Sequence, residues 1–211
     1  MLLPPWFPDW SGQVCAIVAS GPSVVREEVE SLRGRCKVVV VNNSHEIAPW
    51  ADLLYAADGR WWDQYPKATR FEGLKVTADR DAAKRYGLHI ATLLGETDKD
   101  SDKFAIEPSG AIARGGNSAF QAVNLVTRFG CRRQLWMGFD FTGEHWHGTH
   151  AAPLRNPRPQ TLEKWARRFD AQAAALADMS VEVVNCSSLS VLKNYRRGTV
   201  ETALSDWGAF A

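Results

Sequence analysis

Three histidines fall within six residues of the sequence, in the segment Glu144-His145-Trp146-His147-Gly148-Thr149-His150. A neutral imidazole can take a proton from a substrate or contact a phosphate, and several imidazoles together can bind zinc or iron. Three interpretations of His145, His147 and His150 therefore stay open: a catalytic base or phosphate contact, a metal site made of all three rings, and a grouping without a function.

Polar residues follow each apolar run that predicts a buried strand. Short, nearly continuous apolar runs are typical of buried parallel strands. The runs and the residues after them are 14–19 before Ser20-Gly21-Pro22-Ser23, 36–41 before Asn42-Asn43-Ser44, 52–57 before Asp58, 134–137 before Gly138-Phe139-Asp140-Phe141-Thr142, and 181–184 before Asn185-Cys186-Ser187. Because open α/β sheets bind ligands at the carboxyl ends of their strands, we expect these side chains to meet at one site.

The turn after the first run suits a phosphate. It leads into residues 26–33, whose charged, periodic sequence predicts a helix, and backbone N–H groups point outward at such a helix start. Ser20 or Ser23 can cap that helix and donate a hydroxyl. The turn matches neither the Gly-x-Gly-x-x-Gly nor the Walker pattern. The amides of Asn42 and Asn43 can contact a phosphate or a base edge, or they can simply turn the chain.

Two further segments can hold an anion. Gly115-Gly116-Asn117-Ser118 precedes residues 119–129, which are predicted to form an amphipathic helix, and a glycine-rich helix start allows close backbone approach to a ligand. The basic segment 155–158 (Arg-Asn-Pro-Arg) can clamp a phosphate or be solvated. Neither segment specifies a ligand by itself.

The alternation of strand and helix signals predicts an α/β fold. Further strands are expected at 75–77 and 89–94, and further helices from residue 60 and over 162–177, with 189–195 and 200–204 completing the chain. We expect residues 1–211 to form a single Rossmann-like α/β/α sandwich with a mostly parallel sheet. Residues 1–13 are an irregular lead-in, and residues 95–113 and 142–160 are expected to be loops at the active site.

Composition and charge limit the partners. The 211 residues are 45% hydrophobic, enough for one core, and the net charge of +1 gives no electrostatic reason to expect nucleic acid or a membrane as the main partner. The sequence contains neither a signal peptide nor an apolar run of membrane-spanning length, so a cytoplasmic location is expected. Four dispersed cysteines are interpreted as free thiols. Nine tryptophans belong mainly to the core, and homo-oligomerisation stays open.

The order of these motifs resembles a known superfamily. It unites the family 42 bacterial sialyltransferases, the motility-accessory-factor glycosyltransferases and the MptE-type 6-hydroxymethylpterin diphosphokinases. The resemblance extends from about residue 14 to about residue 200 and consists of Ala-Ser-Gly-Pro-Ser, Val-Asn-Asn, Tyr-Ala-Ala-Asp, Gly-Gly-Asn-Ser, Met-Gly-Phe-Asp-Phe, a downstream histidine and Val-Asn-Cys-Ser-Ser.

The resemblance implies a binding site for a nucleotide or nucleotide-sugar of the CMP type. In the sialyltransferases, segments similar to 20–23, Asn42 and Gly116-Asn117 contact the nucleotide, and a loop histidine similar to His150, with His147 second, is the general base. Thr142 stands where that family has a tyrosine that steadies the leaving phosphate, so the group transferred does not follow from the resemblance. The resulting cofactor-binding candidates are Ser20, Gly21, Pro22, Ser23, Asn42, Asn43, Asp58, Gly116, Asn117, Ser118, Thr142, Asn185 and Ser187, and the catalytic candidates are His150, His147 and Asp140.

The resemblance implies a transferase with a nucleotide-activated donor and a small-molecule or glycan acceptor, most directly a glycosyltransferase. Alternatives on the same fold are a pyrophosphokinase in which Asp58 and Asp140 hold Mg²⁺, and a metal-dependent nucleotide hydrolase that uses His145, His147 and His150. A non-catalytic nucleotide-binding module is the alternative outside the enzymes.

Overall fold

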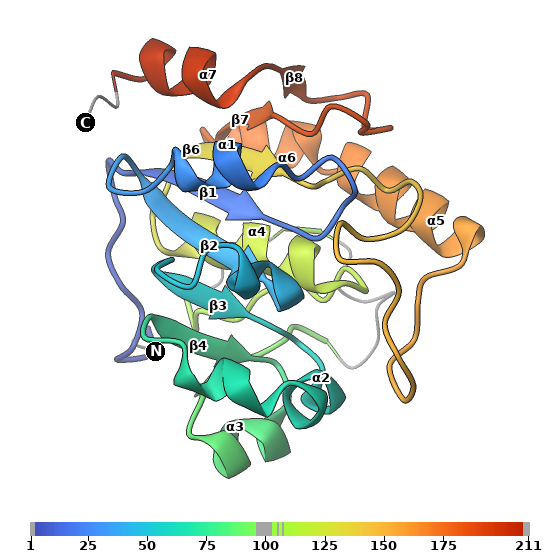
Figure 1. Cartoon of the computed structure of the whole chain (residues 1–211). Helices are drawn as coiled ribbons and strands as arrows, with labels where there is room; N and C mark the ends of the chain where they lie inside the picture. Colours follow the sequence, from blue (N-terminus) through green and yellow to red (C-terminus); the bar gives the residue numbers. More distant parts are fainter. Residues whose placement is uncertain (1–2, 96–102, 105, 107, 209–211) are drawn as a thin grey trace.

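The chain is built on one eight-stranded sheet in which every neighbouring pair of strands is parallel (Figure 1). The computed structural model describes residues 3–95, 103–104, 106 and 108–208. The strands are β1 (Val14–Val18), β2 (Lys37–Val41), β3 (Leu53–Tyr55), β4 (Leu74–Thr77), β5 (His89–Ile90), β6 (Arg133–Met137), β7 (Glu182–Asn185) and β8 (Arg196–Arg197). The predicted Rossmann-like α/β sandwich is therefore confirmed.

The strand order β5-β4-β3-β2-β1-β6-β7-β8 reverses direction beside β1. The chain proceeds outward from β1 to β5, returns through a long connection to β6 on the other side of β1, and then proceeds outward to β8. In open α/β sheets, the loops on either side of such a reversal diverge and leave a crevice at the carboxyl ends of the strands. The topology therefore locates the expected ligand site between the loops that follow β1 and β6.

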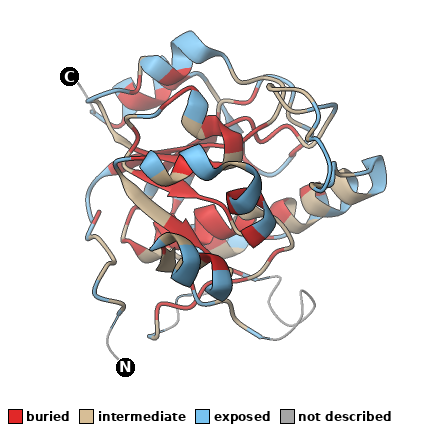
Figure 2. Ribbon diagram, turned by 60° about the horizontal axis from the view of Figure 1, so that its bottom comes forward, coloured by how far each residue is buried: buried red, intermediate tan, exposed pale blue. Residues whose placement is uncertain are grey.

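Helices cover both faces of the sheet, which is buried between them (Figure 2). One face packs against α1 (Arg26–Glu30), α2 (Gly59–Gln64), α3 (Arg80–Tyr86) and α7 (Val200–Asp206), and the other against α4 (Ser118–Arg128), α5 (Pro159–Asp170) and α6 (Ala173–Asp178). Two 3₁₀ helices, Asn42–Glu46 and Pro66–Arg70, follow β2 and α2. In β1, Cys15 and Ile17 enter one core and Ala16 and Val18 enter the other, as the two-residue period of a strand requires.

Several predicted elements differ in extent from the observed ones. The helix expected over 162–177 is two helices, α5 and α6, and the strand expected over 89–94 is only the two residues of β5. Helix α3 was not predicted, although Asp79 caps it and Gly87 ends it in the left-handed conformation. Within the predicted loop 95–113, residues 96–102, 105 and 107 lie outside the described residues.

The free thiols predicted from the composition are observed. All four cysteines are free thiols; Cys15 and Cys131 are buried, whereas Cys36 and Cys186 are only partly so. Among the helices that the structure describes, none has the length and apolar content needed to cross a membrane.

A buried carboxyl group joins the loops after β1 and β6. Asp140 is fully buried, and its Oδ2 accepts hydrogen bonds from the backbone N–H of Ser23 at 2.9 Å and from the Ser23 hydroxyl at 2.8 Å. Gly21 packs so closely that a Cβ there would overlap both the Asp140 carboxyl group and the Gly138 carbonyl oxygen. The two loops that border the crevice are thus held as one unit.

Replacing Ser23 by alanine removes one of the two donors to this carboxyl group. A buried acceptor that loses a partner typically costs about 1–3 kcal/mol, so we expect Ser23→Ala to lower the free energy of unfolding by that amount in urea titrations. Ser188→Ala, at an exposed loop position, is the matched control and should change it by less than about 0.5 kcal/mol. Equal losses in the two variants would contradict a stabilising role for the Ser23–Asp140 pair.

Candidate functional site

A cavity of about 430 Å³ opens at the carboxyl ends of the strands. It lies between the residues after β1, β2 and β3, the start of α4, the long loop after β6 and the first turns of α5. This is the position that the reversal of strand order predicts for a ligand crevice. Its volume is in the range typical of sites for small molecules and cofactors.

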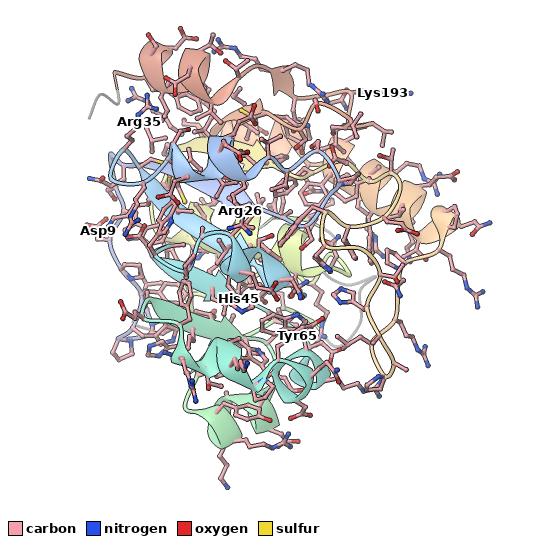
Figure 3. All side chains as sticks on the ribbon, viewed as in Figure 1. Asp9, Arg26, Arg35, His45, Tyr65 and Lys193 are labelled. Atoms are coloured by element: carbon pink, nitrogen blue, oxygen red, sulfur yellow. The ribbon has the colours of Figure 1, made fainter. Side chains whose placement is uncertain are left out.

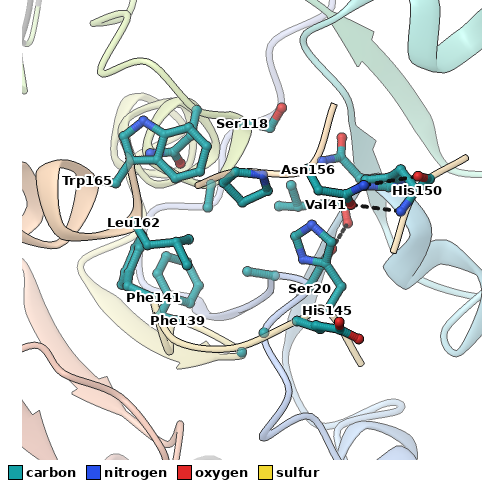
Figure 4. Close-up of a pocket in the computed structure, with 18 of the residues that line it drawn as sticks. Ser20, Val41, Ser118, Phe139, Phe141, His145, His150, Asn156, Leu162 and Trp165 are labelled. Atoms are coloured by element: carbon teal, nitrogen blue, oxygen red, sulfur yellow. Dashed lines mark hydrogen bonds between the residues drawn. The ribbon is translucent and has the colours of Figure 1, made fainter. Parts of the chain in front are cut away.

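One side of the cavity is apolar and the other is polar (Figure 4). Phe139 and Phe141 from the loop after β6 and Leu162 and Trp165 from α5 form the apolar side. The polar side includes Ser20, Ser118, His145 and His150. A ligand with a flat or apolar part and a polar, hydrogen-bonding part matches this division.

The start of α4 provides unoccupied donors on the polar side. Asn117 caps the helix, because its Oδ1 accepts a hydrogen bond from the Phe120 N–H at 2.9 Å. Among the described residues its Nδ2 has no hydrogen-bond partner, although the atom is buried and the residue lines the cavity. The helix has eleven residues, and the N-terminus of such a helix attracts anions. A phosphate or carboxylate would satisfy both groups.

The glycines before α4 bring its first turn close to the cavity. Gly115 has a φ of +57°, and a Cβ there would overlap the ring of Phe120. Ser118 lines the cavity, and its hydroxyl accepts a hydrogen bond from the Ala57 N–H after β3 at 3.3 Å. The glycine-rich sequence is thus explained by close packing at this helix start, as well as by access for a ligand.

The histidine loop is attached to the end of β1. The Trp146 N–H donates to the Ser20 carbonyl oxygen at 3.0 Å, and the Trp146 indole N–H donates to the Ser44 hydroxyl at 3.3 Å. Ser44 in turn donates to the Ala19 carbonyl oxygen at 2.8 Å. These bonds position His145 and His150 at the cavity, where both line its wall.

The three imidazole rings lie close together. The ring centroids of His145, His147 and His150 are separated by 5.1, 5.0 and 4.9 Å. His147 does not line the cavity, and its Nε2 is buried with no partner among the described residues. Within the part of the chain that the structure describes, no group of three or more His, Cys, Asp or Glu side chains is arranged to hold a metal ion.

Burial favours the neutral form of all three rings. It lowers the pKa of His145, an effect that a hydrogen bond to the Ser20 backbone opposes. Burial, followed by the nearby His145 and His150, lowers the pKa of His147 to about 4. Burial, followed by the charge of His145, lowers the pKa of His150 below its ordinary value of 6.5. At neutral pH each ring can therefore accept a proton.

Tyr65 contacts His150 from outside the cavity lining. Figure 3 shows Tyr65 at the end of α2 nearest the histidine loop, and its hydroxyl lies 3.4 Å from His150 Nδ1. This contact leaves Nε2 of His150 as the nitrogen available to a substrate. The Tyr65 ring also packs against Trp61, whose indole N–H donates to Asn43 Oδ1 at 2.8 Å. Asn43 therefore has a packing role beneath the site.

Two residues that line the cavity have a left-handed backbone conformation. Asn42 has a φ of +52° and Phe141 a φ of +56°, in the left-handed region that side chains other than glycine rarely adopt. At a bulky residue such as Phe141 this conformation costs about 1–3 kcal/mol, and such strain clusters at binding sites. The third such residue, Ser180, lies in the turn before β7. Asparagine adopts this conformation more readily than most residues with a side chain, so Asn42 fits a chain turn as well as a ligand site, and the strain lies at Phe141.

The structure brings together about half of the candidate residues. Those that line the cavity are Ser20, Gly21, Asn42, Asp58, Asn117, Ser118, Thr142, His145 and His150. Those that do not are Pro22, Ser23, Asn43, Gly116, Asp140, His147, Asn185 and Ser187. Ser23, Asn185 and Ser187 instead border a separate 310 Å³ cavity beside β7, and Asp140 lies beneath the loop after β1.

Sequence reasoning did not identify the apolar wall. Leu162 and Trp165 belong to a helical stripe with Ala166 and Phe169, at spacings of three, four and seven residues. This spacing predicts a buried face, and Ala166 and Phe169 are indeed in the core. The first half of the stripe, however, lines the cavity. Periodicity alone does not distinguish a face that meets the core from one that meets a ligand.

The fold and the cavity define the class of this protein as a doubly wound α/β protein with a cavity at the reversal of strand order. Comparisons of the chain with family models, with curated proteins and with solved structures find no match. The resemblance to the superfamily of the family 42 sialyltransferases stays a prediction from sequence motifs.

The lowered pKa of His147 predicts a stability that depends on pH. Between the ordinary value of 6.5 and the folded value of about 4, the unfolded chain binds more protons than the folded chain. The free energy of unfolding should therefore fall as the pH falls through this window. His147→Gln removes the imidazole that titrates differently in the two states. The free energy of unfolding should then depend less steeply on pH, and the slope that remains is due to His145 and His150. Urea titrations at intervals between pH 4.5 and 8 measure it.

The control for this measurement is the range above pH 7.5, where all three imidazoles are neutral in both states. There the two proteins should differ by a constant offset. If His147→Gln retains the full slope between pH 6.5 and 4.5, His147 is not held neutral by burial.

Proposed function

We propose that the chain is a nucleotide-dependent transferase that takes a nucleotide-activated sugar as donor and uses His150 as general base. One observation carries this proposal: a single cavity combines the start of α4, which has unoccupied donors for a phosphate, with neutral imidazoles on the same polar side. The motif order in the sequence supports the same class.

The separation of the cavity into a polar and an apolar side suggests which residues bind the donor and which assist the reaction. The α4 backbone N–H groups and Asn117 Nδ2 hold the donor phosphate and stabilise the charge that develops on it. Phe139 and Phe141 exclude water and pack against the apolar part of the ligand. The acceptor hydroxyl lies next to His150, whose Nδ1 faces Tyr65 and whose Nε2 is available.

The reaction balances without a further reagent. The acceptor oxygen forms a bond to the donor carbon while the bond from that carbon to the phosphate oxygen breaks, and its electron pair leaves with the nucleotide. The acceptor proton passes to His150. A base with a pKa below neutrality is suited to this step because it is unprotonated at the start.

A ligand that binds the native state should raise its stability. At a hundredfold excess over the dissociation constant the gain is about 2.7 kcal/mol, so we expect one of CMP, CDP, UDP, GDP or ADP, or a sugar conjugate, to raise Tm. Asn117→Ser keeps the cap oxygen but lacks the free amide and should weaken binding about tenfold. Asp79→Ser, at the cap of α3, is the matched control and should bind normally. Silence of every nucleotide would overturn the proposal.

Loss of His150 should separate binding from turnover. In His150→Gln, nucleotide affinity should stay within about threefold, while release of nucleotide from the donor falls at least a hundredfold, the typical contribution of a general base. His89→Gln, at the distant edge strand β5, controls for loss of a partly buried imidazole. In the parent protein, the acid limb of the pH–rate profile should lie below pH 6.5.

Other results identify the alternatives. Binding without turnover in the parent protein indicates a nucleotide-binding module. Strict dependence on Mg²⁺, together with loss of activity in Asp58→Asn, indicates a pyrophosphokinase, because Asp58 lines the cavity and carboxylates are the ligands that Mg²⁺ prefers.

A further inference from the structure

We infer that the acceptor is a single-stranded nucleic acid whose backbone lies along α5 and the segment that precedes it. The inference rests on the proposed transferase function for its chemistry. The binding that it predicts is measured without a donor, so its failure is distinguishable from failure of the proposed function.

The charge of the chain is unevenly distributed. Residues 150–168 contain four arginines and one lysine but a single glutamate, a formal charge of +4, whereas the whole chain carries +1. The remaining residues are therefore net negative, at −3. The whole-chain charge gave no reason to expect nucleic acid, because the negative charge of the other residues offsets a basic segment. This segment extends from the histidine loop into α5.

Four of the five cations of this segment are available to a ligand; the fifth, Arg168, is partly buried and donates to the Gly115 carbonyl oxygen at 2.9 Å. The side chains of Arg155, Arg158 and Lys164 are exposed, and among the described residues they have no hydrogen-bond or ion-pair partner. Arg167 pairs with Glu163 at 3.7 Å, but both side chains are about 70% exposed, so the pair is weak. Figure 3 shows side chains ending in nitrogen that extend from α5 into solvent. Counterions at such positions are readily replaced by phosphates.

The basic segment adjoins the mouth of the cavity. Arg155 and Asn156 line the cavity, and so do Leu162 and Trp165 from the first turns of α5. These turns extend beyond the sheet (Figures 1 and 2). A cation-bearing surface thus leads directly to the place where the acceptor hydroxyl must meet His150.

The size of the cavity requires most of the acceptor to stay outside. A volume of about 430 Å³ is at the lower end of sites for one small ligand, and a nucleotide-sugar donor occupies most of it. Only the reacting part of the acceptor can then enter. A polymer that lies on the outer surface and inserts one group satisfies this limit.

The chemistry of the surface favours nucleic acid over other polyanions. Three of its four exposed cations, Arg155, Arg158 and Arg167, are arginines, whose planar guanidinium groups bind phosphates with two hydrogen bonds and stack on bases. Trp165 and Arg155 both line the cavity, so an aromatic ring and a guanidinium group border the same opening, whereas Lys164 and Arg167 lie on the exposed face of the helix. Aromatic rings next to cations are typical of single-strand binding. A duplex keeps its bases paired and stacked on one another, so they could not stack on Trp165.

The test measures binding of a fluorescein-labelled oligothymidylate of about 20 nucleotides by fluorescence anisotropy, over a series of salt concentrations. The triple variant Arg158→Gln, Lys164→Gln, Arg167→Gln should bind at least tenfold more weakly. Each phosphate contact contributes about 0.7 to the slope of log affinity against log salt, so the slope should decrease by about 2. None of the three residues lines the cavity, so nucleotide binding should be unchanged.

The matched control is Lys67→Gln, Arg70→Gln, Lys84→Gln, which removes three exposed cations near α2 and α3. It should retain the affinity and the salt slope of the parent protein. Equal losses in the two triple variants would show only non-specific attraction and would overturn the inference.

An abasic oligomer of equal length separates nucleic acid from other polyanions. We expect it to bind at least tenfold more weakly than oligothymidylate, and we expect Trp165→Ala to reduce this preference. If the abasic chain or heparin binds as well as oligothymidylate, the surface recognises charge alone, and the inference of a nucleic-acid acceptor is wrong.

Discussion

The site depends on one buried carboxyl group at the reversal of strand order. The loops after β1 and β6 would otherwise diverge there, because their chains continue to opposite sides of the sheet. Asp140 joins them by accepting two hydrogen bonds from Ser23, and the absence of a side chain at Gly21 allows the close approach. A side chain that the sequence suggested for catalysis thus has a position in which it shapes the loops that line the cavity.

The histidine loop extends this arrangement toward the cavity. It is attached to the end of β1 through the Ser20 carbonyl oxygen and through Ser44, so its position follows from that of the first strand. The same attachment partly buries the imidazoles and lowers their pKa values. Position and protonation state therefore have a common cause, which is the packing of a short loop against the carboxyl edge of the sheet.

The sequence predicted the parts of the fold that periodicity and strand ends determine. Apolar runs identified the central strands, and the residues after them predicted which edge holds the cavity. Which polar residues line the cavity was not predictable, because Ser23 and Asp140 follow strands as Ser20 and Asn42 do, yet bond to each other instead. The apolar wall was missed for a related reason. Trp165 lies on a helical face that packs into the core at one end and lines the cavity at the other, and only the three-dimensional structure shows where the change occurs.

The two halves of helix α5 differ in how much apolar surface they bury. Ala166 and Phe169 are buried in the core, whereas Leu162 and Trp165 face the cavity and have no core on their side. Local stability follows the density of buried apolar contacts, so the first turns should open far more often than the last ones. The apolar side of the cavity formed by Leu162 and Trp165 is then the least stable part of α5. A ligand that packs against these side chains should stabilise the first turns of the helix. Hydrogen-exchange protection along α5 would thus report occupancy of the cavity.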